Sequence, residues 1–215
     1  MIYGWSGDVL RAGDLVVDLG AHNGETTARF AEAVGPTGLV IAVEPSPASM
    51  NELRRRCEAL PQVVAVECAI GAEVGQDVLY MDADDARRNS SWAANVLTPM
   101  IGSCPVTVTT VDVLVGLVPP GRRPRLIHAD IQGSELAMVR GATRTLDLYP
   151  VWSMEVWADG LRHAGATVDD VCRPFEGRGY TLADGESWAH MIERANRHRG
   201  HSAIDVLILP PEATR

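Results

Sequence analysis

The chain has 215 residues, of which 46% are hydrophobic and 22% charged, the balance of an ordinary globular protein. Asp and Glu outnumber Lys and Arg by 28 to 19, and the net charge of −9 argues against non-specific binding of nucleic acid. No apolar run approaches the ~20 residues of a membrane span, and the N-terminus lacks a signal-peptide pattern. None of the four cysteines has metal-ligand spacing, which favours isolated thiols in a reducing compartment. We therefore expect a cytoplasmic protein with no nucleic-acid or membrane partner, folded as a single domain over residues 1–215.

Short β-branched runs alternate along the chain with segments of helical periodicity. The runs predict five inner strands of a parallel sheet, at residues 15–19, 39–43, 63–66, 125–129 and 151–156. Residues suited to a buried helix face recur at spacings of three and four in the segments 27–34, 50–60, 136–146 and 168–175. This alternation predicts a doubly wound α/β fold with right-handed crossovers.

The stretch between the third and fourth predicted strands, residues 71–124, is far longer than one connecting helix requires. Two segments within it, 77–80 and 106–110, have the composition of strands. Residues 82–100 are polar and predict a mobile loop over a site. We therefore expect a β-rich insertion between strands three and four.

The C-terminal part of the chain predicts the edge of the sheet. Residues 203–209 form a strand-like run that ends in two prolines, and we expect it to pair antiparallel with a strand near 179–182. His190, His198 and His201 lie between these segments in a polar stretch that also contains arginines. A solvated helix face explains these histidines better than a metal site does.

A glycine turn follows the first predicted strand, in the sequence Asp18-Leu19-Gly20-Ala21-His22-Asn23-Gly24. Gly20 permits a tight turn, and Gly24 lets the backbone approach a ligand with no Cβ in the way. In open α/β sheets, ligands bind at the carboxyl ends of the strands, where this turn lies. Neither the G-x-G-x-x-G fingerprint of dehydrogenases nor a P-loop is present. Asp18, before the turn, suits a ligand with an ammonium group, such as S-adenosylmethionine.

The next two strand ends carry residues that suit an adenosine. Glu44 ends the second strand and is followed by Pro45, and its carboxylate could accept both ribose hydroxyls. After the third strand, Ala69 and Ile70 offer small and apolar atoms where an adenine ring could lie. Core packing would explain Ala69 and Ile70 equally well.

Asp130 comes directly after the fourth strand and therefore lies at the same edge of the sheet. His128 is two residues earlier, so both side chains point to one side of the strand. We expect His128 to be a hydrogen-bonded core histidine and Asp130 to be the functional residue.

Taken in series, these motifs resemble FkbM-type S-adenosylmethionine-dependent methyltransferases. The matching blocks occur in family order over residues 14 to 182, at 18–24, 44–47, 108–112, 130–135, 141–142 and 179–180. The resemblance implies the class I methyltransferase fold, a Rossmann-like, mostly parallel seven-stranded sheet whose antiparallel last strand lies between strands five and six. It implies that Asp18, Gly20 and Gly24 surround the methionine part of the cofactor, that Glu44 holds the ribose, and that Ala69 and Ile70 flank the adenine. The full set of expected cofactor-binding residues is Asp18, Gly20, Ala21, His22, Asn23, Gly24, Glu44, Pro45, Ala69, Ile70 and Asp130.

The chain departs from the family pattern in two ways. Gln132 precedes Gly133 where the family usually has Glu, so the chain lacks a carboxylate that could act there as a base or cation ligand. The chain also begins almost at the first strand, without the helical extension that often helps to form an acceptor pocket. A lid over the acceptor would then come from residues 82–100, from 156–165, or from a second subunit of a homo-oligomer.

The favoured function is methylation of a hydroxyl group on a sugar or small secondary metabolite, with S-adenosylmethionine as cofactor. Asp130 is the first candidate for the catalytic base and His22 the second, while Asn23 and Gln132 could orient polar groups. A metal-assisted version would use Asp130 and Glu155 as oxygen ligands, but no spacing demands it and we predict no metal. The alternatives are a nicotinamide-dependent oxidoreductase and a non-catalytic module that binds an adenosine ligand.

Overall fold

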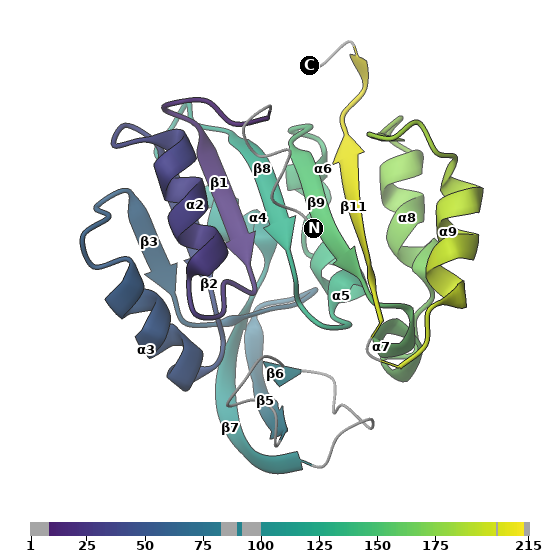
Figure 1. Cartoon of the computed structure of the whole chain (residues 1–215), viewed down its shortest axis with the longest axis horizontal. Helices are drawn as coiled ribbons and strands as arrows, with labels where there is room; N and C mark the ends of the chain where they lie inside the picture. The colour runs from purple at the N-terminus through teal and green to yellow at the C-terminus, as the bar shows by residue number, and fades with distance from the viewer. Residues whose placement is uncertain (1–8, 83–89, 92–99, 201, 213–215) are drawn as a thin grey trace.

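The computed structural model describes residues 9–82, 90–91, 100–200 and 202–212. Its main sheet has seven strands in the order β10-β11-β9-β8-β1-β2-β3 (Figure 1). The strand bounds are β1 (Leu15–Leu19), β2 (Leu39–Val43), β3 (Val63–Val66), β8 (Pro124–Ala129), β9 (Val151–Val156), β10 (Thr181–Leu182) and β11 (Ile204–Leu209). Strand β11 runs antiparallel to both β9 and β10, whereas the pairs among β3, β2, β1, β8 and β9 are parallel. The predicted doubly wound sheet, with its antiparallel last strand inserted next to the edge, is confirmed.

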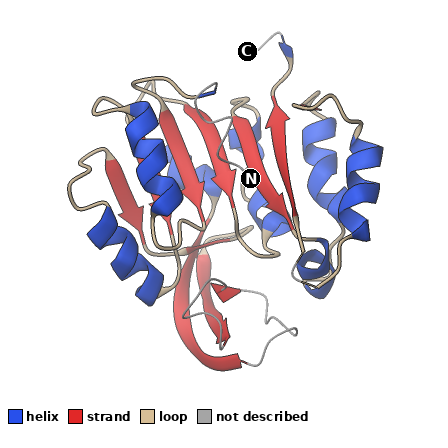
Figure 2. Cartoon of the chain, viewed as in Figure 1, coloured by secondary structure: helices blue, strands red, loops and turns tan. Residues whose placement is uncertain are grey.

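The predicted β-rich insertion forms a second sheet. Its order is β4-β7-β5-β6, and its strands are β4 (Ala69–Ile70), β5 (Gly75–Asp82), β6 (Ser90–Ser91) and β7 (Met100–Thr109). Figure 2 shows this sheet projecting beyond the ends toward which the main parallel strands point. Strand β7 stops one residue before the predicted end because the Thr110 hydroxyl accepts the N–H of Val113 and begins helix α4 (Val111–Gly116). Most of the loop predicted over 82–100 lies outside the described residues.

Helices cover both faces of the main sheet. Helices α2 (Glu25–Val34) and α3 (Pro47–Arg56) lie on the front face in Figure 1, and α4, α5 (Glu135–Arg140) and α6 (Thr143–Leu146) lie behind. In α2 and in α8 (Val168–Glu176), the buried residues are the ones that the spacing of three and four predicted. They are Thr27, Phe30, Ala31 and Val34 in α2, and Val168, Val171, Cys172 and Phe175 in α8. Helices α7 (Ala158–His163) and α9 (Trp188–Arg197) complete the C-terminal side.

The single helix predicted over 136–146 is wrong, because the chain forms α5 and α6 with a break at Gly141. A Cβ atom at Gly141 would lie 2.2 Å from the carbonyl oxygen of Gly71, so only glycine lets the two backbones approach this closely. The carbonyl of Gly141 accepts the N–H of Asp112 at 3.0 Å, and the Asp112 carboxylate caps the start of α6. Helix α3 likewise ends at Arg56, earlier than the predicted helical segment 50–60, so Leu60 lies beyond the helix.

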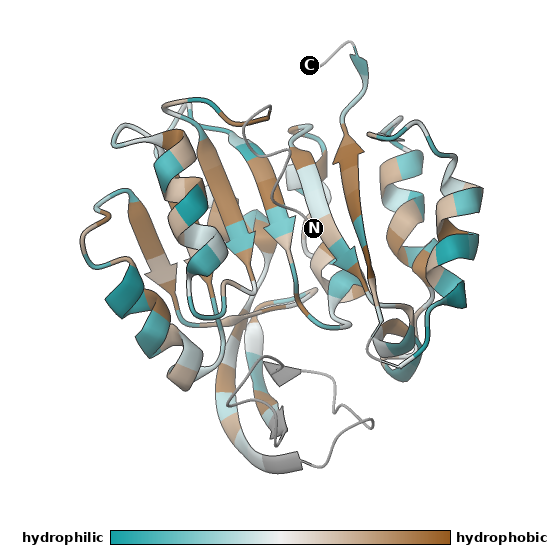
Figure 3. Ribbon diagram, in the orientation of Figure 1, coloured by the Kyte–Doolittle hydropathy of each residue, from teal (hydrophilic) through white to brown (hydrophobic). Residues whose placement is uncertain are grey.

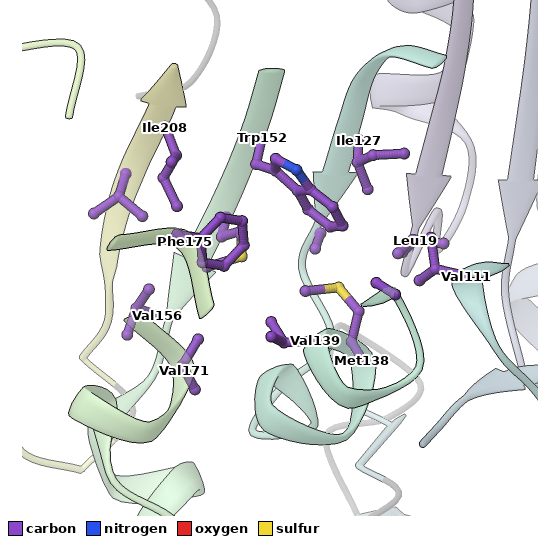
Figure 4. Packing of buried hydrophobic residues seen from close by; sticks show 14 of the residues in the cluster. Leu19, Val111, Ile127, Met138, Val139, Trp152, Val156, Val171, Phe175 and Ile208 are labelled. Atoms are coloured by element: carbon purple, nitrogen blue, oxygen red, sulfur yellow. The ribbon is translucent and has the colours of Figure 1, made fainter. Parts of the chain in front are cut away.

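The largest part of the core lies between the sheet and the helices behind it, and smaller clusters lie under α2 and α3 on the front face. Brown ribbon in Figure 3 marks the apolar strands, and Figure 4 shows Trp152 of β9 among Met138, Val139 and Phe175 from the helices. The Trp152 and Phe175 rings meet edge to face with centroids 5.3 Å apart, and both side chains are completely buried. Among the described residues, no helix has the length and apolar character needed to cross a bilayer.

Candidate active site

The glycine turn after β1 rests against the end of β8. Gly20 has a φ of +79°, and a Cβ atom there would lie 1.9 Å from the carbonyl oxygen of Asp130. The backbone N–H of Asp130 in turn donates to the carbonyl of Leu19 at 3.0 Å. Glycine at position 20 therefore brings together the predicted cofactor turn and the predicted catalytic residue.

Gly24 has a packing role that the sequence interpretation did not include. Its φ is +81°, and it occupies the position immediately before helix α2. A Cβ atom at Gly24 would lie 2.6 Å from Cδ1 of Leu53 in α3. The missing side chain lets α2 begin close to α3, and an approach of Gly24 to a ligand stays a prediction. The residue before Gly24 also contacts α3, since the Arg56 side chain donates a hydrogen bond to the carbonyl of Asn23 at 2.8 Å.

Glu44 joins the glycine turn to the start of α3. The backbone N–H of His22 donates to Glu44 Oε2, and that of Ser46 donates to Oε1, both at 2.8 Å. Glu44 is 5% exposed, so these two bonds hold its carboxylate firmly at the carboxyl end of β2. The carboxylate thereby lies beside the glycine turn, at the edge of the sheet where the ribose is predicted to bind.

Asp18 is completely buried at the carboxyl end of β1. The hydroxyl of Thr27 in α2 donates to Asp18 Oδ2 at 2.5 Å, whereas Oδ1 has no hydrogen-bond partner among the described residues. Burial raises the pKa of Asp18, and the nearby His128 opposes this rise. A buried carboxylate oxygen without a donor is costly, which makes Asp18 a candidate to meet a cationic ligand.

His128 behaves as the predicted core histidine. It is 4% exposed, its Nδ1 lies 3.3 Å from the Ser153 hydroxyl, and its ring meets Phe30 edge to face at 5.5 Å. Ala69 and Ile70 are also buried, in β4, where they pair with Val108 and Thr109 of the second sheet. Contact of Ala69 and Ile70 with an adenine ring stays a prediction.

A pair of carboxyl groups bridged by an amide occupies the ends of β8 and β9. Ala129 pairs with Met154 across these strands, so Asp130 and Glu155 follow at the same level. Gln132 has a φ of +50°, and its Nε2 lies 2.6 Å from Asp130 Oδ1 and 2.9 Å from Glu155 Oε2. One side-chain NH₂ group therefore donates to both carboxyl groups.

The amide is neutral and cannot balance two negative charges. Burial raises the pKa of Glu155 to about 8, assisted by the charge of Asp130 and a hydrogen bond to it and, more weakly, by Asp205 and Glu135. Glu135 is also completely buried: its Oε1 accepts the N–H of Gly133 at 3.0 Å, and Oε2 has no partner in the described part of the chain. Burial raises the pKa of Glu135 to about 7. Glu155 and Glu135 therefore bind a proton more readily than exposed glutamates do.

The family of the chain follows from its sequence. The profile of the methyltransferase FkbM domain matches residues 18–182, which is well over half of the chain and includes every motif described above. The chain belongs to the FkbM methyltransferase family. Among curated proteins, no sequence matches it.

Solved structures share the fold of this FkbM methyltransferase. A methyltransferase FkbM from Methylobacillus flagellatus KT superposes with a TM-score of 0.56 at 17% identity, over 96% of this chain and 46% of that one. This chain thus spans about half the length of that relative. Aeropyrum pernix fibrillarin with natively bound S-adenosyl-L-methionine gives a TM-score of 0.50 at 13% identity, covering 94% of this chain and 68% of that one. A SAM-dependent O-methyltransferase from Thermotoga maritima superposes with a TM-score of 0.50 at 12% identity, covering 98% of this chain and 66% of that one.

The FkbM assignment decides one of the open alternatives. The methyltransferase family replaces the nicotinamide-dependent oxidoreductase. Among the described residues, no group of three or more His, Cys, Asp or Glu side chains could hold a metal ion. His190 contacts Glu186 and His198 contacts Ser202, while His201 lies outside the described residues.

Sequence reasoning missed the amide-bridged carboxyl pair at the ends of β8 and β9. It paired Asp130 with Glu155 only as ligands of a possible metal, named Gln132 only as an orienter of polar groups, and did not single out Glu135. The strand register brings Glu155 beside Asp130, and the left-handed turn at Gln132 aims its amide back at both. The one available signal was the presence of acids at the ends of neighbouring parallel strands, since such ends meet at one edge of the sheet.

Proposed function

We propose that this FkbM methyltransferase transfers the methyl group of S-adenosylmethionine to a hydroxyl group of a sugar or another small metabolite. The observation that carries this proposal is the amide-bridged carboxyl pair of Asp130 and Glu155, which lies directly against the cofactor turn at Gly20. A hydroxyl acceptor must lose a proton when it is methylated, and this pair can take it. Acceptors that are nucleophilic without a base have less need of such a pair.

The residues present fit S-adenosylmethionine. Asp18 Oδ1 is a buried acceptor atom without a donor, which suits the ammonium group of the methionine part. The fixed carboxylate of Glu44 would accept the ribose hydroxyls, and Ala69 and Ile70 supply the apolar surface for adenine. The remaining contacts come from Gly20, Ala21, His22, Asn23, Gly24 and Pro45 of the two adjoining turns.

The chain's own residues align the acceptor and take its proton. When bound, S-adenosylmethionine supplies an electrophilic methyl carbon, so the protein has to place the acceptor oxygen in line with it. Alignment alone can lower the barrier by roughly 7–11 kcal/mol. Removal of the hydroxyl proton by Asp130 adds about 10²–10⁴-fold. His22 stays the second candidate: its backbone N–H is held by Glu44, and its side chain is half-buried.

Two measurements test the proposal. Calorimetric titration with S-adenosylhomocysteine, and separately with NAD, should give binding of the first compound only. Transfer of a tritiated methyl group from S-adenosylmethionine is then measured across sugars, small alcohols and phenols, with amines, thiols and RNA as comparison. Methylation of a hydroxyl compound supports the proposal, whereas exclusive labelling of amines, thiols or RNA contradicts it. Binding of S-adenosylhomocysteine without transfer to any acceptor would support the non-catalytic binding module instead.

A further inference from the structure

The Asp130–Glu155 pair has an arrangement that a single catalytic carboxylate does not need. The two side chains come from different strands, and the Gln132 amide nitrogen lies 2.6 Å from one and 2.9 Å from the other. An amide NH₂ group has two hydrogens and can donate one to each carboxylate. The two amide hydrogens can stabilise both oxygens as ionised acceptors, whereas the direct hydrogen bond between Glu155 and Asp130 favours the protonated form of Glu155.

We propose that Asp130 and Glu155 form one proton-accepting pair, and that Gln132 is the positioning residue that holds the two carboxyl groups together and makes their joint ionisation easier. This inference rests on the proposed function and adds Glu155 to the catalytic residues. When the acceptor's O–H bond breaks, the proton passes to a carboxylate oxygen of the doubly ionised pair. The electron pair stays on the acceptor oxygen, which becomes the nucleophile.

The surroundings of the pair explain why an amide is useful at position 132. Among the described residues, the charged groups that act on Glu155 are Asp130 at the end of β8, Asp205 of β11 and Glu135 of α5, all of them acidic. Each of these charges opposes ionisation of the pair. A glutamate at position 132 would add another negative charge, whereas glutamine adds two hydrogen-bond donors and no charge. Gln132 thus makes the ionised pair accessible closer to neutral pH.

The pair can be observed without any acceptor, by carbon NMR of the full-length protein labelled with ¹³C at the glutamate and aspartate carboxyl groups. Titration should show two glutamate signals with midpoints well above the ordinary value of 4.5, near 8 and near 7. The Glu155→Gln variant should lose the more alkaline signal, and Glu135→Gln should lose the other. Glu58→Gln removes an exposed glutamate and should leave both signals in place.

The Gln132 variants decide the role of the amide. Gln132→Leu removes the donors and Gln132→Glu also adds a charge, so each should raise the Glu155 midpoint, the second by more. A rise of one pH unit lowers the ionised fraction about tenfold below the midpoint. Calorimetry with S-adenosylhomocysteine checks that each variant is folded. An ordinary midpoint for Glu155, or one that neither Gln132 variant moves, would overturn the inference, whether or not a hydroxyl acceptor is found.

Once an acceptor is known, the same variants separate the two proposals. The turnover number should rise with pH through the midpoint measured for Glu155, and Gln132→Glu should move that rise to higher pH with the KM for S-adenosylmethionine unchanged. Turnover that does not follow the midpoint would reject the pair as the proton acceptor while leaving O-methylation intact.

Discussion

Gln132 has an amide NH₂ where a glutamate, the residue expected from the family pattern, would have a carboxylate oxygen. This difference removes one negative charge from the site and adds two hydrogen-bond donors. A carboxylate there would be the third acid beside Asp130 and Glu155, and Glu135 is buried nearby. The amide instead bridges the two acids. The sequence identified the substitution, but its effect depends on the left-handed φ of residue 132 and on the register of β8 with β9, which no local pattern reports.

Replacing Asp130 by Asn tests the first candidate base with little change of shape. We expect turnover to fall by about 10²–10⁴-fold, because the proton acceptor is lost while the backbone contact with Gly20 is kept. Affinity for S-adenosylhomocysteine, measured by calorimetry, should change much less than turnover. Undiminished turnover would remove Asp130 from the mechanism.

Gly20→Ala should disrupt the site and destabilise the fold, since the new Cβ would clash with the carbonyl of Asp130 at 1.9 Å. Gly121 is a matched control, because its φ is +87° and a Cβ there would meet nothing within 4 Å. Gly121→Ala should cost only the backbone strain of about 1–2 kcal/mol. Urea unfolding of both variants measures the difference, and equal costs would mean that the turn moves aside easily.

The helices and strands were predictable from the sequence where the spacing of apolar residues was regular. The ends of β1, β2 and β9 agree with their β-branched runs, since inner strands are apolar on both faces. Strand β3 also has the predicted bounds, but the prediction that it is an inner strand is wrong, because it lies at the edge of the sheet and Val64 is 47% exposed. The buried faces of α2 and α8 also followed from their spacing. The division into α5 and α6 did not, because it arises from contacts with Gly71 and Asp112, which are distant in sequence.

Asp112 should stabilise the start of α6 by capping it. Its carboxylate accepts the backbone N–H groups of Arg144 and Thr145 and the hydroxyl of Thr145, at 3.0, 2.7 and 2.8 Å. Although burial opposes it, these hydrogen bonds hold the pKa of Asp112 below its ordinary value. Asp112→Ala should cost about 1–2 kcal/mol in urea unfolding, and Asp112→Asn, which keeps one acceptor oxygen, should cost less. Identical losses for the two variants would argue against capping as the cause.

The whole molecule places two buried carboxyl groups, Asp18 and Glu135, and the half-buried Glu155 at one edge of its main sheet. Burial raises the pKa of all three, so the fold is less stable when they are ionised. Their grouping follows from the class I topology, which was predictable from the alternation of strands and helices. Their raised pKa values were not predictable from the sequence, because they depend on how completely each carboxyl group is buried in the folded chain.

Stability should therefore fall as pH rises through the neutral range. Above the ordinary pKa of 4.5 the unfolded chain releases the protons of Glu135 and Glu155, while the folded chain keeps them up to about pH 7 and 8. The folded state thus binds more protons in this window, so the free energy of unfolding decreases with pH. Urea unfolding at pH 5.5 and 8.5 should show the decrease, and Glu155→Gln should reduce it. A Glu155→Gln variant with the wild-type pH dependence would contradict this account.

Gly20 and Asp130 are in direct contact. The turn proposed to bind the methyl donor therefore packs directly against the strand end proposed to accept the proton, with no residue between them. Mutations at one therefore disturb the other, and this edge of the sheet has little freedom to diverge. The outlying sheet of β4, β5, β6 and β7 is not under this restriction, although it projects from the same end of the molecule. Relatives that adopt new acceptors should accordingly differ most in the length and sequence of that projection.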